Sequence, residues 1–273
     1  MISFPNSKIN LGLHILNKRA DGFHNLETIF YPVNIKDALE IVENKESGAP
    51  GLSWSASGKS IEGKEDDNLC IKAFHLVKKD HPQLPDIKMH LHKNIPSGAG
   101  LGGGSADAAF TLQLLNKKFS LSVSAEKMQQ YALHLGSDCP FFLVNRPAMA
   151  TGRGEILKPV EVELSLYKLL IVNPGIHVNT GWAFEQLQLS DQKRESLAHI
   201  IQLPVNEWKY KLVNDFEAPV FAAHPAIKKI KETLYSHGAI YAAMSGSGSS
   251  VFGIFEKETA GIEFPAAYFC KWV

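Results

Sequence analysis

The sequence has no excess of either charge and no long apolar run. Lys and Arg together number 28, as do Asp and Glu, so no global field favours a polyanionic partner such as DNA or a membrane surface. Any phosphate-binding site must therefore be local. No apolar run reaches the roughly 18 residues that a membrane span requires. The first residues, MISFPNSKINLGLHIL, lack a basic leader, and polar residues interrupt what would be the apolar core of a signal peptide.

Cysteine is also scarce. Cys70, Cys139 and Cys270 are odd in number, far apart and free of any CxxC pairing, which argues against a disulfide framework and against a zinc site. A reducing compartment suits such a chain. We therefore expect a soluble, cytoplasmic protein.

The length of 273 residues exceeds the usual size of one domain, and a hydrophobic content of 45% is enough for a sizeable core. Strands and helices alternate, with hairpin-like pairs, which favours the α+β class. The chain changes character after ATGRGEILKPV. We predict two domains, residues 1–155 and 156–273.

A strand, a loop and a helix follow one another from residue 87. IKMHLHKNI, residues 87–95, alternates apolar and polar side chains with the period of a half-buried strand. PSGAGLGGGS, residues 96–105, is called the glycine loop here. The apolar periodicity beyond it predicts a buried helix capped by Ser105, with Asp107 well placed for the positive end of the helix dipole.

The glycine loop is typical of a phosphate cradle. Its five glycines let backbone N–H groups approach an anion, and the helix that follows can stabilise its charge. A flexible linker would not be bounded by a period-2 strand and an apolar helix. A dinucleotide-binding unit is disfavoured because another helical segment follows where a parallel strand is needed. No GK[ST] closes the loop, which excludes a P-loop.

Further segments show regular periodicity. A helix with Met128, Tyr131 and Ala132 on one face is predicted to stop at Gly136, and Pro140 stands where another helix can start. Asp138 lies in the corner between them and reads equally well as a helix cap or as a catalytic group. Near the C-terminus a helix precedes two strands, AIYAAM and VFGIF, that flank SGSGSS.

Three segments together resemble the signatures of the GHMP kinase superfamily. They are PNSKINLGLHI (5–15, the first segment), the glycine loop, and AAMSGSGSSVFGIF (242–255, the third segment). Order and spacing both match over the whole chain. The resemblance implies a two-domain GHMP kinase fold, with an N-terminal domain like ribosomal-protein S5 domain 2 and a ferredoxin-like C-terminal domain.

The resemblance also implies a nucleotide site and a catalytic pair. Asp138 would be the catalytic aspartate, and Lys8 would be the basic residue whose charge attracts the hydroxyl and phosphate oxygens. Without the resemblance, Lys8 would be interpreted as an exposed lysine at the start of a strand. The residues expected to bind ATP are Pro96, Ser97, Gly98, Ala99, Gly100, Leu101, Gly102, Gly103, Gly104, Ser105 and Ala106.

SKINLGLHILNKRADGFHNLETIF, GSDCPFFL and ATGRGE resemble one branch of the superfamily, which phosphorylates the 2-hydroxyl of a cytidine-diphosphate-linked methylerythritol in non-mevalonate isoprenoid synthesis. The resemblance implies that Phe23 stacks on cytosine and His24 hydrogen-bonds it. Phe23 stands where the family usually has a tyrosine. Its ring can still stack on the base, but it cannot form the hydrogen bond that a tyrosine hydroxyl would make. The other substrate-binding residues implied are Asn10, Thr180 and Phe184, with Trp182 competing with Phe184 and a core role open for Phe23.

ATP is the expected co-substrate, and Mg²⁺ is expected to accompany it, with Ser105 the one protein ligand that we name. No protein metal site is predicted, because a solvated strand face explains His90 and His92. The expected partner is a small-molecule substrate, without nucleic acid or membrane, for a monomer or weak homodimer. The rival hypotheses are a homoserine or mevalonate type of GHMP kinase, a non-catalytic ligand-binding protein and a nucleic-acid module.

Overall fold

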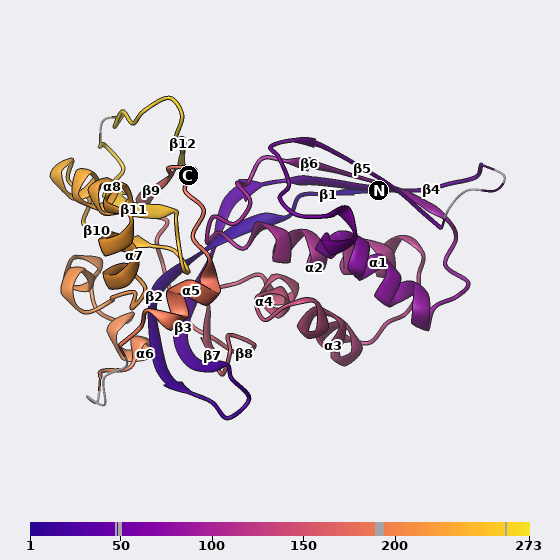
Figure 1. The fold of residues 1–273 in the computed structure, drawn as a ribbon, viewed down its shortest axis with the longest axis horizontal. Helices are drawn as coiled ribbons and strands as arrows, with labels where there is room; N and C mark the ends of the chain where they lie inside the picture. Colours follow the sequence, from indigo (N-terminus) through magenta and orange to yellow (C-terminus); the bar gives the residue numbers. More distant parts are fainter. Residues whose placement is uncertain (47, 49–50, 189–193, 260) are drawn as a thin grey trace. The chain divides into compact units, whose positions relative to one another are not determined.

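The computed structural model describes residues 1–46, 48, 51–188, 194–259 and 261–273. Its elements form two compact units, and each unit draws on several stretches of the chain (Figure 1). The first unit comprises Met1–Ser7, Asn34–Ser97 and Gly102–Asn145, and the second comprises Lys8–Val33, Gly98–Leu101 and Arg146–Val273. The domain boundary near residue 155 stays a prediction.

The first unit is a four-stranded sheet with helices against one face (Figure 1). The strand order is β1-β4-β6-β5, with β5 and β6 parallel and the other pairs antiparallel. The strands are β1 (Ile2–Ser3), β4 (Ala38–Glu43), β5 (Leu52–Gly58) and β6 (Ile87–Lys93). The helices are the 3-10 helix η1 (Glu65–Asp67), α1 (Leu69–Asp80), α2 (Gly103–Lys118), α3 (Ala125–Leu135) and α4 (Cys139–Val144).

Strand β6 has the predicted period of two, with Ile87, Met89 and Leu91 buried. These side chains join α1 and α2 in the core of this unit. The strand ends at Lys93, two residues before the end that the sequence predicts, and Lys93 is itself buried.

The helix after the glycine loop starts earlier than predicted. Helix α2 begins at Gly103, and its N-cap is Gly102, whose φ of 70° is left-handed. The prediction that Ser105 caps this helix is therefore wrong, because Ser105 lies inside its first turn. Helix α3 does end before Gly136, and α4 does carry Pro140 in its first turn, so both predictions are confirmed.

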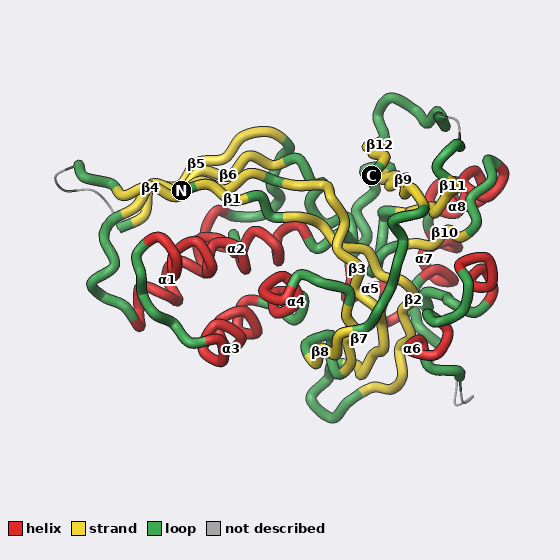
Figure 2. The backbone as a smooth tube through the Cα atoms, turned by 180° about the vertical axis from the view of Figure 1, so that it is seen from behind, coloured by secondary structure: helices red, strands yellow, loops and turns green. Residues whose placement is uncertain are grey.

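The second unit contains two four-stranded sheets (Figure 2). Along the chain, β2 (Asn6–Lys18) begins in the first unit and continues into the second, whereas β3 (His24–Lys36) begins in the second unit and ends in the first. One sheet has the order β2-β3-β7-β8, formed by β2 (Asn6–Lys18), β3 (His24–Lys36), β7 (Ala148–Thr151) and β8 (Ile156–Pro159). The other has the order β10-β11-β9-β12, formed by β9 (Tyr167–Asn173), β10 (Tyr241–Met244), β11 (Val251–Glu256) and β12 (Phe269–Trp272).

The core of the second unit is closed by helices. Val220, Ile227, Ile230 and Leu234 pack with the apolar residues of β9, β10 and β11. The helices are α5 (Thr180–Glu185), α6 (Leu197–Ile200), the 3-10 helix η2 (Val205–Tyr210), α7 (Glu217–Ala223) and α8 (Pro225–Ser236). The mixture of helices with mainly antiparallel sheets confirms the α+β class. In the described part of the chain, no helix combines the length and the apolar character needed to cross a membrane.

Candidate active site

Lys8 joins the first segment to the glycine loop. It lies on β2 with 3% of its surface exposed. Its Nζ donates to Asn10 Oδ1 at 2.7 Å and to the carbonyl of Gly100 at 3.2 Å, and it lies 5.0 Å from the centre of the Phe30 ring. The backbone N–H of Lys8 donates to the carbonyl of Leu101 at 2.9 Å. These contacts help to hold the ammonium group in place.

The third segment contacts the same point. The backbone N–H of Asn10 donates to Ser245 Oγ at 3.3 Å, and this hydroxyl donates to the carbonyl of Gly100 at 2.8 Å. Gly100 has a φ of 76°, and a Cβ there would lie 2.1 Å from the carbonyl oxygen of Ser245. Only glycine lets the two loops approach this closely. The structure therefore brings residues from all three segments together within the second unit.

The predicted base-binding residues lie elsewhere in the second unit. The rings of His24 and Phe184 stack, with centroids 4.7 Å apart and an interplanar angle of 14°. Phe184 also meets the Phe216 ring edge-on at 4.9 Å. Trp182, the competing aromatic, packs against His224. Phe184, and not Trp182, is thus the aromatic ring beside His24.

Two contacts connect these rings to neighbouring motifs. Thr180 Oγ1 and Ser247 Oγ are 2.8 Å apart, which ties α5 to the third segment. The Phe23 ring, 53% exposed, lies 4.6 Å from the guanidinium carbon of Arg153 in ATGRGE.

Burial lowers the pKa of His24, and the positive charge of Lys18 lowers it further. His24 is therefore neutral at physiological pH, with one ring nitrogen able to donate and the other to accept.

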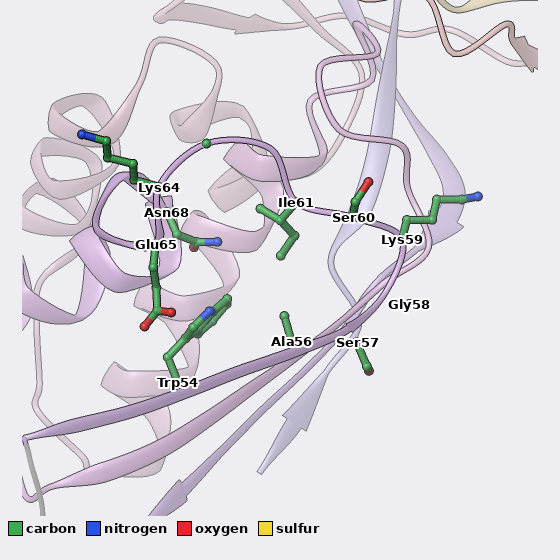
Figure 3. A pocket seen from close by; sticks show the side chains of 11 residues that line it. Trp54, Ala56, Ser57, Gly58, Lys59, Ser60, Ile61, Lys64, Glu65 and Asn68 are labelled. Carbon is green, nitrogen blue, oxygen red and sulfur yellow. The ribbon is translucent and has the colours of Figure 1, made fainter.

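The start of the glycine loop adjoins a hollow in the first unit. Ser97 Oγ donates to the carbonyl of Ser60 at 3.3 Å. The hollow has a volume of about 360 Å³, and the side chains of Trp54 and Ile61 point into it from opposite sides (Figure 3). Its lining comes from β5, η1 and the segment between them, with Asn68 at the start of α1. A hollow that combines an aromatic ring and an aliphatic side chain with polar and charged groups suits a flat heterocycle with polar edges.

Asp138 and Ser105 both lie in the first unit. Asp138 is the N-cap residue of α4, yet its side chain makes no capping hydrogen bond, which weakens the interpretation of this residue as a helix cap. The Ser105 hydroxyl pairs with the thiol of Cys139. Burial raises the pKa of that thiol to about 12, and the charge of Asp138 adds to the rise while Ser105 opposes it. Cys139 is therefore an inert thiol at physiological pH.

The predicted magnesium ion needs few ligands from the protein. Within the described ranges, no group of three or more His, Cys, Asp and Glu side chains could hold a metal. Mg²⁺ that accompanies a nucleotide takes most of its oxygen ligands from phosphate and water, so one or two protein groups suffice. The residues present are compatible with that mode, and Mg²⁺ stays a prediction.

Sequence reasoning missed three parts of this arrangement. Ser245 lies in the third segment and Arg153 lies in ATGRGE, but the sequence alone assigns neither residue a role. The hollow lined by residues 54–68 was not anticipated. Arg153 could have been suspected from its place in a motif next to the predicted base site, whereas the hollow has no sequence signature.

Family models match both halves of the chain. The model described as GHMP kinases N terminal domain matches residues 68–146, and that described as GHMP kinases C terminal matches residues 201–271. These matches agree with the three segments read from the sequence.

Curated relatives match nearly the full length. A protein of Bacteroides fragilis strain YCH46 named 4-diphosphocytidyl-2-C-methyl-D-erythritol kinase is 52% identical, covering 98% of this chain and 97% of its own length. One of the same name from Chlorobium phaeobacteroides is 41% identical over 92% of this chain and 87% of its own.

Solved structures are similar as well. A crystal structure of 4-(cytidine 5'-diphospho)-2C-methyl-D-erythritol kinase has a TM-score of 0.80 and 31% identity, covering 93% of this chain and 90% of that one. The mevalonate kinase of Methanococcus jannaschii, at 14% identity, has a TM-score of 0.71 and covers 95% of this chain and 92% of its own, which shows the shared fold.

Proposed function

Since this chain belongs to the GHMP kinases, and within them to the 4-diphosphocytidyl-2-C-methyl-D-erythritol kinases, we propose that it transfers the γ-phosphoryl group of ATP to the 2-hydroxyl of that cytidyl alcohol. The observation that carries the proposal is the 52% identity with a relative of that name over almost the whole of both chains. The chain is a phosphotransferase, and the acceptor is the part of the reaction that we propose.

In the proposed reaction, the 2-hydroxyl oxygen forms a bond to the γ-phosphorus while the bond to the β,γ-bridging oxygen breaks, and ADP leaves. Asp138 accepts the proton of the attacking hydroxyl. Lys8 supplies positive charge to the phosphoryl oxygens and to the hydroxyl. Its fixed position, held by Asn10 and Gly100, supports this role because a preorganised charge need not reorganise during the reaction.

ATP is proposed to bind through the glycine loop and the hollow beside it. Backbone N–H groups of the loop and the N-terminal end of α2 suit the phosphates. The hollow between Trp54 and Ile61 suits the adenosine, and the hydrogen bond from Ser97 to Ser60 supports this by connecting the two parts. Mg²⁺, when bound with ATP, would neutralise charge on the β- and γ-phosphates, with Ser105 as a candidate ligand.

The cytosine is proposed to bind at the aromatic residues of the second unit. Phe23 is exposed enough to offer a ring face, and Phe184 presents the face that His24 now covers. Binding between Phe23 and Phe184 therefore requires His24 to leave Phe184, after which a ring nitrogen of His24 can pair with an edge of the base. Asn10 and Thr180 are proposed to contact the rest of the acceptor.

A coupled assay of ADP release tests the choice of acceptor. The panel is the cytidyl alcohol, its uridyl analogue, mevalonate and homoserine, each with saturating ATP and Mg²⁺. We expect kcat/KM for the cytidyl alcohol to exceed each of the others by roughly tenfold or more, because a site that pairs with a base edge rejects a mismatched one. Equal or greater turnover of mevalonate or homoserine would overturn the proposal.

A further inference from the structure

Lys93 is a buried lysine that the proposed reaction does not use. Strand β6 places alternate residues on its buried face, and Lys93 follows Ile87, Met89 and Leu91 on that face with 3% of its surface exposed. A buried ammonium group strongly disfavours folding unless opposite charges and hydrogen bonds compensate it. A lysine at this position therefore requires partners brought from elsewhere in the first unit.

The partners are two buried carboxylates. Lys93 Nζ donates to Asp37 Oδ2 and, at 2.7 Å, to Asp107 Oδ2. Asp37 directly precedes β4 and Asp107 lies on α2, with 1% and 2% of their surfaces exposed. Burial alone lowers the pKa of Lys93, but the two carboxylates outweigh it and raise the pKa. The lysine is therefore charged, and the cluster joins three elements.

Asp37 binds the backbone of the segment that connects β6 to the glycine loop. Its Oδ1 accepts the backbone N–H groups of Asn94 at 2.6 Å and Ile95 at 2.8 Å. These two residues are the last before Pro96, where the loop begins. Both oxygens of Asp37 are thus used, one for the chain entering the loop and the other for Lys93.

Asp107 connects helix α2, which follows the glycine loop, to Lys93. It lies four residues after Gly103, the first residue of α2, and a Cβ at Gly103 would be 3.1 Å from Lys93 Nζ. Among the described residues, Asp107 Oδ1 has no hydrogen-bond partner. Burial raises the pKa of Asp107, and Asp37 adds to the rise while Lys93 opposes it. A buried, half-satisfied carboxyl group is destabilising, so its presence suggests a role other than stability.

The backbone of Lys93 contacts the wall of the hollow. Its carbonyl accepts the N–H of Lys59 at 2.8 Å, and a Cβ at Gly58 would lie 2.2 Å from that oxygen. Gly58 and Lys59 both line the hollow that is proposed to take adenosine. Lys93 thus contacts the wall of the hollow, the aspartate that binds the entry to the glycine loop, and the helix that follows the loop.

We propose that Lys93, Asp37 and Asp107 form a charge clamp that fixes the two sides of the glycine loop at the spacing that nucleotide phosphates require. They are positioning residues, since they act through the loop and not by touching substrate. This inference adds a structural reason for the proposed binding of ATP by the glycine loop, and it depends on that proposal.

The test compares three substitutions at Asp107 in the full-length protein. Asp107→Asn keeps an oxygen that accepts from Lys93, whereas Asp107→Leu has a similar size and no acceptor. Asp107→Ala removes the acceptor without adding bulk and keeps the test decisive if the leucine variant does not fold. The measurements are the affinity for ADP by titration, the affinity for CDP by titration, and the midpoint of thermal unfolding.

We expect Asp107→Leu and Asp107→Ala to weaken ADP binding by roughly tenfold or more, because without the acceptor the loop adopts its binding conformation less often and the apparent affinity falls by that fraction. Asp107→Asn keeps the acceptor and loses only the charge, so it should weaken ADP binding less than either of them, and CDP binding should not change in any variant. Equal weakening by all three variants, or a lower unfolding midpoint with unchanged ADP affinity, would overturn the clamp. Because ADP binding needs no acceptor, failure of the cytidyl alcohol as substrate would leave this result intact.

Discussion

Asp138 and Lys8 are the two residues proposed to carry out the phosphoryl transfer. Asp138 has the position of a helix cap without making a capping hydrogen bond. Lys8 is buried, where most lysines are exposed, and its ammonium is held by an amide and a carbonyl oxygen. Both settings are compatible with the catalytic roles that we propose for these residues.

Replacing Asp138 by Asn should lower kcat by roughly 10²–10⁴-fold, because the amide has the same size but cannot accept the proton. ADP affinity should stay within about threefold of the parent. Steady-state kinetics and ADP titration check this, with Asp86→Asn as the matched control. A kcat close to that of the parent would exclude Asp138 as the base.

Replacing Phe23 by Ala should weaken acceptor binding by about 1–3 kcal/mol, the usual contribution of a stacked aromatic face. Because 53% of this side chain is exposed, its loss should change the unfolding midpoint little. KM for acceptor and for ATP should be measured separately, and only the first should rise. Tyr210→Ala, at a ring 83% exposed, serves as the control. A Phe23 variant that behaves like the Tyr210 variant would remove this ring from the site.

At the scale of elements, the glycine loop is shaped by its neighbours as much as by its own composition. Helix α2 starts at Gly103 because Gly102 adopts a left-handed conformation, so Ser105 is within the helix and is paired with Cys139. Gly100 is tied to the third segment through Ser245. The loop is thus a junction between segments that lie far apart in the sequence.

Gly100 and Gly175 allow a matched test of that junction. Both have left-handed backbones, with φ of 76° and 73°, but a Cβ at Gly175 would meet nothing within 4 Å. Gly175→Ala should lower the free energy of unfolding only by the cost of placing alanine in a left-handed conformation, about 1 kcal/mol. Gly100→Ala should lower the free energy of unfolding further and should also weaken ADP binding, because the methyl group would strike the Ser245 carbonyl. Chemical denaturation and ADP titration distinguish the two, and equal losses would mean that the approach of the loops is unimportant.

At the scale of the whole molecule, one buried histidine links stability to pH. His14 on β2 is 3% exposed, and its Nε2 has no hydrogen-bond partner within the described part of the chain. Burial lowers its pKa below 6.5, and Arg194 lowers it too, while Asp215 and Glu27 oppose the shift. The unfolded chain therefore binds a proton at a higher pH than the folded chain does.

Below about pH 6.5 the unfolded state takes up more protons at His14 than the folded state does. The free energy of unfolding therefore falls as the pH falls, by at most about 1.4 kcal/mol per pH unit. His14→Phe should reduce that acid-induced loss, since phenylalanine does not titrate. Unfolding midpoints at pH 7.5 and 5.5 check this, with the exposed His134→Phe as control. An unchanged pH dependence in His14→Phe would show that His14 does not contribute.

Local pattern was sufficient for much of the fold and for the family. The period of β6, the end of α3 before Gly136, the start of α4 near Pro140 and the strands β10 and β11 were all predicted, because turn residues and apolar periodicity act over a few residues. The three segments identified the GHMP kinases for a similar reason, since each motif encodes a short piece of backbone geometry.

The sequence by itself therefore determined the elements, the family and the candidate residues, because these depend on neighbours along the chain. Only the tertiary structure decided which candidates meet. Asn10 and Ser245 are 235 residues apart, and Lys93 is paired with an aspartate 56 residues away. Periodicity counts Lys93 only as a polar residue at the end of a strand, because the acids that make its burial tolerable come from other elements that packing brings to it.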